Sequence, residues 1–204
     1  MKKRLTVFTA LLLALTCLVM CACNKTDRNL NKMVKKSYDY VSLTITTDIE
    51  GVILTSVYTA TKTENNQTQI RFSYQTFNTI DVSNGSITLP EGRITTYRGT
   101  LTVDVNRNNA VVKSSGDEID INLKEVTAKN VKFDSKNFTD IKDNDGFFSA
   151  KINDLSRFMG TSVKGSDGTV QVRYLDGSLV SMVISYVNGQ GSVITADYSY
   201  QQEN

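Results

Sequence analysis

Residues 170–200 read VQVRYLDGSLVSMVISYVNGQGSVITADYSY, and this segment predicts the architecture of the chain most directly. Apolar and polar side chains alternate along it in three runs, a period of two that is typical of strands with one buried and one wet face. Asp176-Gly177 divides the first two runs, and Asn188-Gly189 divides the second from the third. Both pairs tolerate the positive φ angles of tight hairpin turns. The segment is therefore predicted to form consecutive antiparallel strands.

The same alternation recurs upstream, from residue 38 onward. The run at Ile70, Phe72 and Tyr74 is one example, and pairs such as Asp145-Gly146 provide the turns. About ten such strands predict an all-β protein with one or two very short helices. We expect a single antiparallel domain over residues 38–204, folded as a strongly curved sheet that forms either a half-barrel or a sandwich.

The body of the chain lacks the side chains that most catalytic sites use. The sequence contains no His and no Trp, and its three Cys residues all lie within the first 23 positions. Ser-His-Asp and Cys-His nucleophile systems and Cys/His zinc sites are therefore excluded. A pair of carboxylates is enough to hydrolyse a glycosidic bond, but no feature marks such a pair among the acidic residues. We expect a protein that is not an enzyme and that uses no cofactor.

The densest acidic loop holds Asp140, Asp143 and Asp145. Oxygen-rich loops are what Ca²⁺ selects, but this loop fails the EF-hand test because isoleucines would occupy its first and twelfth positions. A polar turn before the next strand is the expected structure, and no metal site is predicted.

The first residues predict an export signal and a lipid anchor. A basic start precedes an apolar run over residues 5–20, which is shorter than a membrane-spanning helix and typical of a secretory signal. The letters LVMCAC at residues 18–23 resemble a bacterial lipoprotein signal. That resemblance implies that residues 1–22 are removed as a signal peptide and that Cys23 is acylated, with Cys21 as the alternative. The expected location is the extracytoplasmic side of a cell membrane, where the acyl chains hold the protein.

The charge is uneven along the chain. Residues 23–37 form a basic stem with a net charge of +4, whereas the rest of the chain after it carries −5. The stem is interpreted either as a membrane-proximal segment attracted to anionic lipid or as a solvated linker. The net-acidic body carries no basic stripe, so nucleic acid is not an expected partner.

Two short helices are expected. Leu30, Met33 and Val34 are spaced as one face of a helix in the stem, and Asp27 is placed to cap it. Residues 153–160 are the second candidate, with a cap at Asn153 or Asp154 and a glycine stop.

Aromatic and apolar strand residues supply the candidate ligand site. They could line a concave apolar groove, in which Met adapts to irregular ligands and Tyr offers a polar tip. The alternative is that they form the packed core of a sandwich or closed barrel. The candidates are Phe72, Tyr74, Val172, Tyr174, Met182, Ile184 and Tyr198.

Residues 170–200, together with the short leading helix and the meandering strands before them, resemble the bacterial lipoprotein-carrier and cell-wall lipoprotein group. The resemblance implies a half-barrel whose concave face holds lipid. We therefore expect a lipid-anchored binding module for an apolar or lipid ligand. The alternative is a structural or interaction β-sandwich lipoprotein that contacts an envelope polymer or a protein partner.

Overall fold

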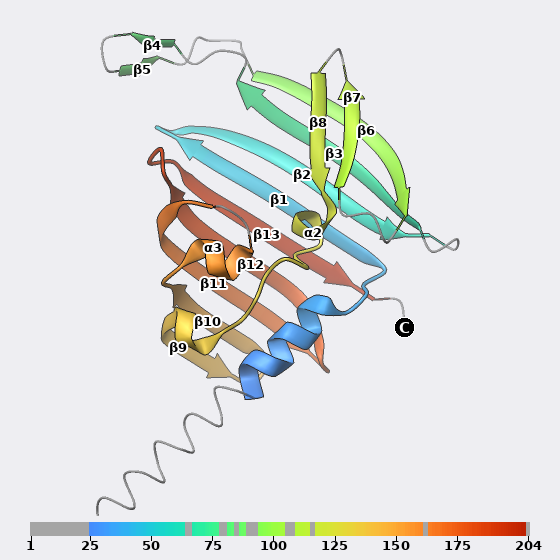
Figure 1. Cartoon of the computed structure of the whole chain (residues 1–204), viewed down its shortest axis with the longest axis vertical. Helices are drawn as coiled ribbons and strands as arrows, with labels where there is room; N and C mark the ends of the chain where they lie inside the picture. The colour runs from blue at the N-terminus through green and yellow to red at the C-terminus, as the bar shows by residue number, and fades with distance from the viewer. Residues whose placement is uncertain are drawn as a thin grey trace, which may run out of the picture.

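Nine strands form one open antiparallel sheet in the computed structural model of the chain (Figure 1). The structure describes residues 25–63, 67–77, 81–83, 86–88, 94–104, 109–114, 117–160 and 163–202. The strand order is β6-β3-β2-β1-β13-β12-β11-β10-β9, and its edge strands β6 and β9 lie at opposite ends. The sheet is curved, so these nine strands form a half-barrel. The predicted all-β class is confirmed in its half-barrel form, and the sandwich form is wrong because the nine strands share one sheet.

The main-sheet strands are β1 (Tyr40–Ile49), β2 (Val52–Lys62), β3 (Gln67–Phe77), β6 (Ile94–Asp104), β9 (Phe138–Asn144), β10 (Phe147–Ile152), β11 (Gly165–Leu175), β12 (Ser178–Asn188) and β13 (Val193–Gln201). Two separate hairpins pair β4 (Asp81–Ser83) with β5 (Ser86–Thr88) and β7 (Asn109–Ser114) with β8 (Asp117–Asn122). The helical segments are an N-terminal helix (residues 25–35), α2 (Leu123–Val126), the 3-10 turn η1 (Ser135–Asn137) and α3 (Leu155–Met159).

The turns that the sequence predicted between the last three strands are present. Asp176 and Gly177 join β11 to β12 with φ angles of 48° and 70°, the pair of positive values that a type I′ turn requires. Between β12 and β13, the Asn188 side-chain oxygen accepts hydrogen bonds from the backbone N–H groups of Gln190 and Ser192, each at 2.9 Å. Local side-chain chemistry therefore fixes the register of these strands.

Alternation along the strands divides the sheet into an inward and an outward face. On β1, Val41 and Leu43 are buried, whereas Ser42 and Thr44 between and beyond them are partly exposed. The inward face carries the core, because the helices and the long connections lie on that side (Figure 1).

The N-terminal helix, residues 127–134 and α3 cover one part of the inward face (Figure 1). The predicted apolar face of the helix, Leu30, Met33 and Val34, is buried in the core. Phe133 of the connection packs against three further aromatic rings at centroid distances of 5.4 to 5.9 Å. These rings belong to Phe138, Phe148 and Phe158.

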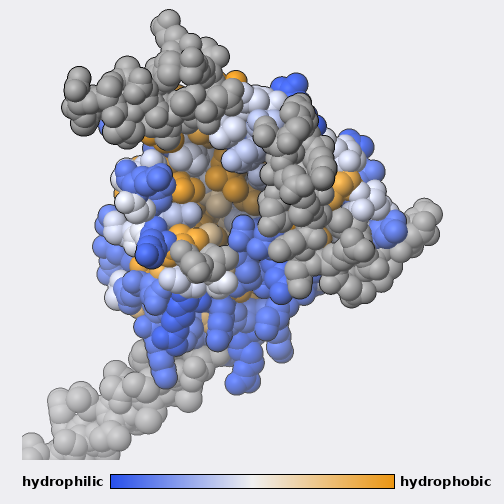
Figure 2. All heavy atoms as spheres, turned by 45° about the horizontal axis from the view of Figure 1, so that its top comes forward, coloured by the Kyte–Doolittle hydropathy of each residue, from blue (hydrophilic) through white to orange (hydrophobic). Residues whose placement is uncertain are grey.

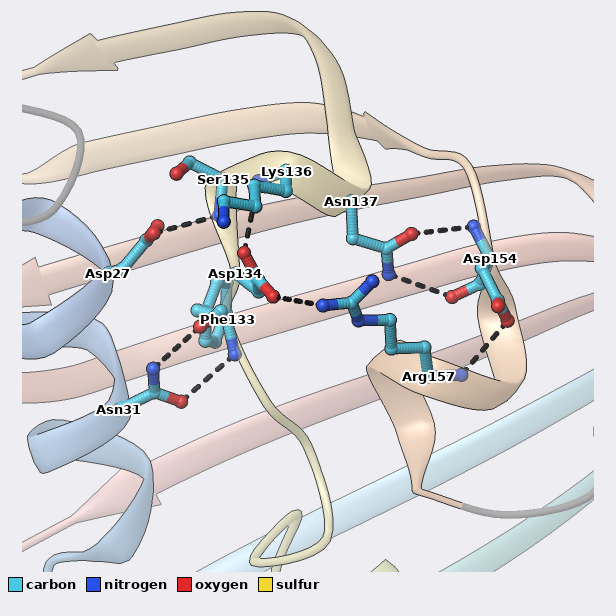
Figure 3. Close-up of polar contacts among 9 residues, drawn as sticks. All are labelled: Asp27, Asn31, Phe133, Asp134, Ser135, Lys136, Asn137, Asp154 and Arg157. Atoms are coloured by element: carbon cyan, nitrogen blue, oxygen red, sulfur yellow. Dashed lines mark hydrogen bonds and ion pairs between the residues drawn. The ribbon is translucent and has the colours of Figure 1, made fainter. Parts of the chain in front are cut away.

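Polar contacts fasten the N-terminal helix to the connection that follows α2 (Figure 3). The Asn31 side-chain amide donates to the carbonyl of Phe133 at 2.7 Å, and its oxygen accepts from the N–H of Phe133 at 2.9 Å. Asp27 accepts from the N–H of Ser135 at 2.8 Å. The prediction that Asp27 caps the helix is therefore wrong, because the helix already includes residues 25 and 26 and the carboxylate serves a distant backbone instead.

The second predicted helix is confirmed as α3. Asp154, rather than Asn153, is its N-cap, because the Asp154 carboxylate accepts from the N–H of Arg157 at 3.0 Å. Gly160 ends the helix with a φ of 62°. The Arg157 guanidinium forms an ion pair of 2.6 Å with Asp134, which ties α3 to the connection before η1 (Figure 3).

Candidate apolar binding site

The inward face contains a hollow of about 280 Å³ near the turn that joins β1 to β2. The helix α2, which packs against the same two strands, lies beside it. The space-filling view shows apolar side chains gathered in a hollow of the surface (Figure 2). Three adjacent strands supply the described residues that line it. They are Ile45, Thr47 and Ile49 of β1, Leu54, Ser56 and Tyr58 of β2, and Tyr74, Gln75 and Thr76 of β3.

The hollow lies where the backbone pairing of β2 with β3 stops. The ladder between these strands runs from Lys62 to Val57 of β2 and extends no further along the described residues. Past that point, Thr55 N–H donates to the Gln75 side-chain oxygen at 2.8 Å, and Gln75 N–H donates to the Ser56 hydroxyl at 3.2 Å. Side chains therefore bridge the two strands where the ladder has ended, which pairs partly buried backbone groups and leaves the hollow beside them.

Three tyrosines form an aromatic wall beside the hollow. Tyr58 and Tyr74 line it directly, and the ring of Tyr74 stacks on Tyr97 of β6 at 6.4 Å between centroids. Burial, followed by the charges of Tyr74 and Glu125, raises the pKa of Tyr58 to about 12. Tyr58 is therefore a neutral phenol at physiological pH, with an apolar ring and a polar tip.

A single turn of helix separates the hollow from the covered part of the core. Asn122 caps α2, since its side-chain oxygen accepts from the N–H of Lys124 at 3.0 Å. The Tyr198 hydroxyl donates to the carbonyl of Glu125 at 2.9 Å, which ties α2 to β13. Burial, with the nearby Glu125 and Tyr186, raises the pKa of Tyr198 well above its usual value, so the phenol keeps the proton that this bond needs.

The structure separates the seven residues predicted to line a groove. Tyr74 lines the hollow. Tyr174 lies past an irregularity in the pairing of β11 with β12, and its hydroxyl donates to Asp143 at 3.3 Å, beside a different recess next to the N-terminal helix. The other five are closed within the core: Phe72, Val172, Met182, Ile184 and Tyr198.

None of the three residues of β2 that line the hollow was predicted from the sequence. Ser56 faces inward and Ile53 and Val57 face outward, so polarity does not alternate with the face along this strand. The sequence indicated the inward face of β2 only indirectly. Once Glu50-Gly51 is recognised as a turn, pairing with β1 assigns every residue of β2 to a face.

The predicted acylation site, Cys23 or Cys21, and the predicted signal peptide lie outside the described residues. The predicted acidic loop is wrong for two of its three residues, because Asp140 and Asp143 lie in β9 and Asp145 alone lies in the turn before β10. Asp140 forms an ion pair with Lys151 at 2.7 Å, and Asp143 accepts from Thr26 at 2.6 Å. The part of the chain that the structure describes contains no group of three or more His, Cys, Asp or Glu residues that could hold a metal ion. Over the same residues, no helix is long and apolar enough to cross a membrane.

Comparison with known proteins gives structural neighbours alone. No protein-family model and no curated protein matches the chain. The chain is similar to the crystal structure of LprF from Mycobacterium bovis, with a TM-score of 0.41 and 12% identity, covering 86% of this chain and 92% of LprF. It is also similar to a LolA superfamily protein from Nitrosomonas europaea, with a TM-score of 0.34 and 10% identity, covering 89% of this chain and 94% of that one. A DUF1329 family protein from Desulfovibrio piger has a TM-score of 0.26 and 10% identity over 86% of this chain and 90% of its own. Because these scores are low, the inference of function below rests on the geometry of the hollow.

Proposed function

We propose that this protein is a lipid-anchored binding module whose hollow takes an apolar ligand or one acyl chain at the extracytoplasmic side of a membrane. The observation that carries the proposal is the hollow itself, an uncharged recess on the inward face of an open sheet. A closed sheet or a filled core would leave no such space.

The lining favours an apolar ligand over a charged one. None of the described residues that line the hollow carries a charge, and Ile45, Ile49 and Leu54 supply branched apolar surface. Tyr58 stays protonated, so its hydroxyl adds a polar tip without a negative charge. Pockets that are mostly apolar with a few polar groups are typical of small-molecule sites.

The proposed anchor rests on the sequence at residues 18–23 and on the position of the stem. The described part of the N-terminal helix begins at residue 25 and packs on the core through Leu30, Met33 and Val34. An acylated Cys23 would therefore place the folded body directly at the bilayer surface, because only one residue separates it from the helix. Removal of Cys23 by a Cys23→Ala substitution is expected to abolish acylation, as measured by intact mass. Acylation that persists would assign the site to Cys21.

Ligand binding is tested by native mass spectrometry of the full chain purified from membranes, with oleate added as the probe. The Leu54→Gln substitution places an amide in the hollow on a side chain that is one atom longer. Because a buried leucine contributes about 1.5 to 3 kcal/mol through its apolar surface, we expect oleate to bind about tenfold more weakly.

Ile53→Gln is the matched control, since Ile53 is the adjacent residue, faces outward and is 60% exposed. It is expected to leave oleate binding unchanged. A second variant, Thr47→Phe, fills the hollow and is expected to exclude oleate without adding a polar group. Equal oleate binding in all four proteins, or none in the unmodified chain, would refute the apolar site.

A further inference from the structure

A second, smaller recess lies at the opposite end of β1 and β2 from the hollow. Its volume is about 100 Å³. Three lysines from three separate segments line it: Lys36 follows the N-terminal helix, Lys62 ends β2, and Lys129 follows α2. Folding thus brings together cations that are far apart in the sequence.

The remaining surface of the recess is hydroxyl-rich above an apolar floor. Ser37, Thr68 and Thr127 supply the hydroxyls. The floor is formed by buried residues, among them Val41 and Ala60 of adjacent strands. Ammonium donors around a small recess are suited to an acceptor-rich ligand such as a phosphate group.

Hydrogen bonds hold the walls of the recess in place. The Tyr38 hydroxyl donates to the carbonyl of Met33 at 3.0 Å and accepts from the N–H of Leu179 at 2.7 Å. The Thr127 hydroxyl donates its proton to the carbonyl of Leu123 at 2.7 Å, so it is not available as a donor to a ligand. The lysines therefore supply the donors, and the fixed walls set the size of the group that fits.

The charges in the recess are unbalanced. None of the described residues that line it carries a carboxylate, and Asp39, next to Tyr38, is not among them. The Lys36 ammonium donates to the Ser178 hydroxyl at 2.6 Å, a neutral group that does not itself line the recess. Three like charges around one small recess repel one another, and an anion between them converts that repulsion into attraction.

We propose that Lys36, Lys62 and Lys129 form a binding site for one phosphate group. The volume suits a single tetrahedral anion and is too small for a nucleotide. The phosphate could come from free inorganic phosphate or from the headgroup of a phospholipid, and both sources present the same oxygens to the lysines. The site is distinct from the hollow and does not depend on the proposed apolar ligand.

The test is calorimetric titration of the full chain, purified in a non-ionic detergent, at low ionic strength. One arm uses inorganic phosphate, and the other uses dihexanoyl phosphatidic acid, a short-chain phospholipid with an exposed phosphate. Binding in the first arm assigns the site to free phosphate, and binding in the second arm alone assigns it to a lipid headgroup. Both results support a phosphate site, whereas no binding in either arm overturns it.

The combined substitution Lys62→Gln and Lys129→Gln is expected to weaken binding at least tenfold, because it removes two of the three charges. Both side chains are exposed, so the variant is expected to fold, and circular dichroism checks this. Replacing the same two lysines with arginine keeps the charges and is expected to retain binding.

Lys124→Gln is the matched control, because Lys124 is an exposed lysine on α2 that does not line the recess. Equal binding by the glutamine variant and the unmodified chain would overturn the proposal. An equal loss in the Lys124→Gln control would also overturn it, because the effect would then reflect net charge alone.

Discussion

Replacing Asn137 with alanine is expected to destabilise the cover over the inward face. Asn137 lies at the end of η1, and its residue is only 3% exposed. Its side-chain amide donates to the carbonyl of Asp154 at 2.8 Å, and its oxygen accepts from the N–H of Asp154 at 2.8 Å (Figure 3). One side chain thus pairs both backbone groups of the residue that caps α3.

The size of the effect follows from these two bonds. Each is worth about 1 kcal/mol net, and a buried backbone group that loses its partner costs about 1 to 3 kcal/mol. The Asp154 carbonyl also accepts from the N–H of Phe158 at 3.1 Å, so only the Asp154 N–H is left without its partner and the penalty is not paid twice. We expect the free energy of unfolding to fall by about 2 to 4 kcal/mol, a large fraction of the roughly 5 to 15 kcal/mol of a typical domain.

The assay is urea unfolding followed by circular dichroism, with Asn153→Ala as the matched control. Asn153 is the neighbouring asparagine, is exposed, and makes one long contact of 3.4 Å to Thr139. The control is expected to change the free energy of unfolding by less than about 0.5 kcal/mol. A loss below about 1 kcal/mol for Asn137→Ala, or equal losses in the two variants, would refute the assignment of Asn137 as the support of α3.

Two further predictions concern the sheet around the hollow. Gly99→Ala is expected to lower the free energy of unfolding by about 1 to 3 kcal/mol, because a Cβ there would lie 2.7 Å from the ring of Phe72 and the ring must move. An unchanged urea midpoint would contradict this prediction. The pKa of Tyr58 is raised to about 12 in the folded protein, whereas an unfolded tyrosine ionises near 10. Because the unfolded state therefore loses this proton first, the free energy of unfolding is expected to fall as the pH rises from about 10 to 12. Tyr58→Phe is expected to reduce that fall in urea titrations across the range, and identical pH dependence in the two proteins would show that Tyr58 does not cause it.

The sequence was sufficient for the parts of the fold that local chemistry determines. Asp176 and Gly177 adopt the two positive φ angles of the predicted turn, and the alternation assigns most residues of the adjacent strands to a face. The exception is beside the turn, where a shift in register buries Leu179 and exposes Val180. The short helix α3 was predicted because Asp154 and Gly160 mark its two ends within a few residues. In each case the determining contacts span only a few positions of the chain.

The location of the hollow could not be predicted in the same way. Met182 and Tyr74 both face inward, yet Met182 is closed within the core and Tyr74 lines the hollow. What distinguishes them is where the N-terminal helix and residues 127–134 pack, and that depends on contacts such as the one from Asp27 to Ser135 across 108 positions. A pattern of period two assigns a side chain to a face, but it carries no information about which part of that face is covered.

The two proposed sites share strands β1 and β2 but are separated by α2. Leu43 lies between them on β1 and is only 2% exposed, and Leu123 and Val126 of α2 are also buried. Among the residues that the structure describes, the inward face is therefore closed between the hollow and the lysine recess, and no continuous channel joins them. If both proposed ligands bind, we expect them to bind independently while α2 stays in place. One amphiphile could occupy both sites only if α2 moved, and that movement would break the hydrogen bond from Tyr198 to the carbonyl of Glu125.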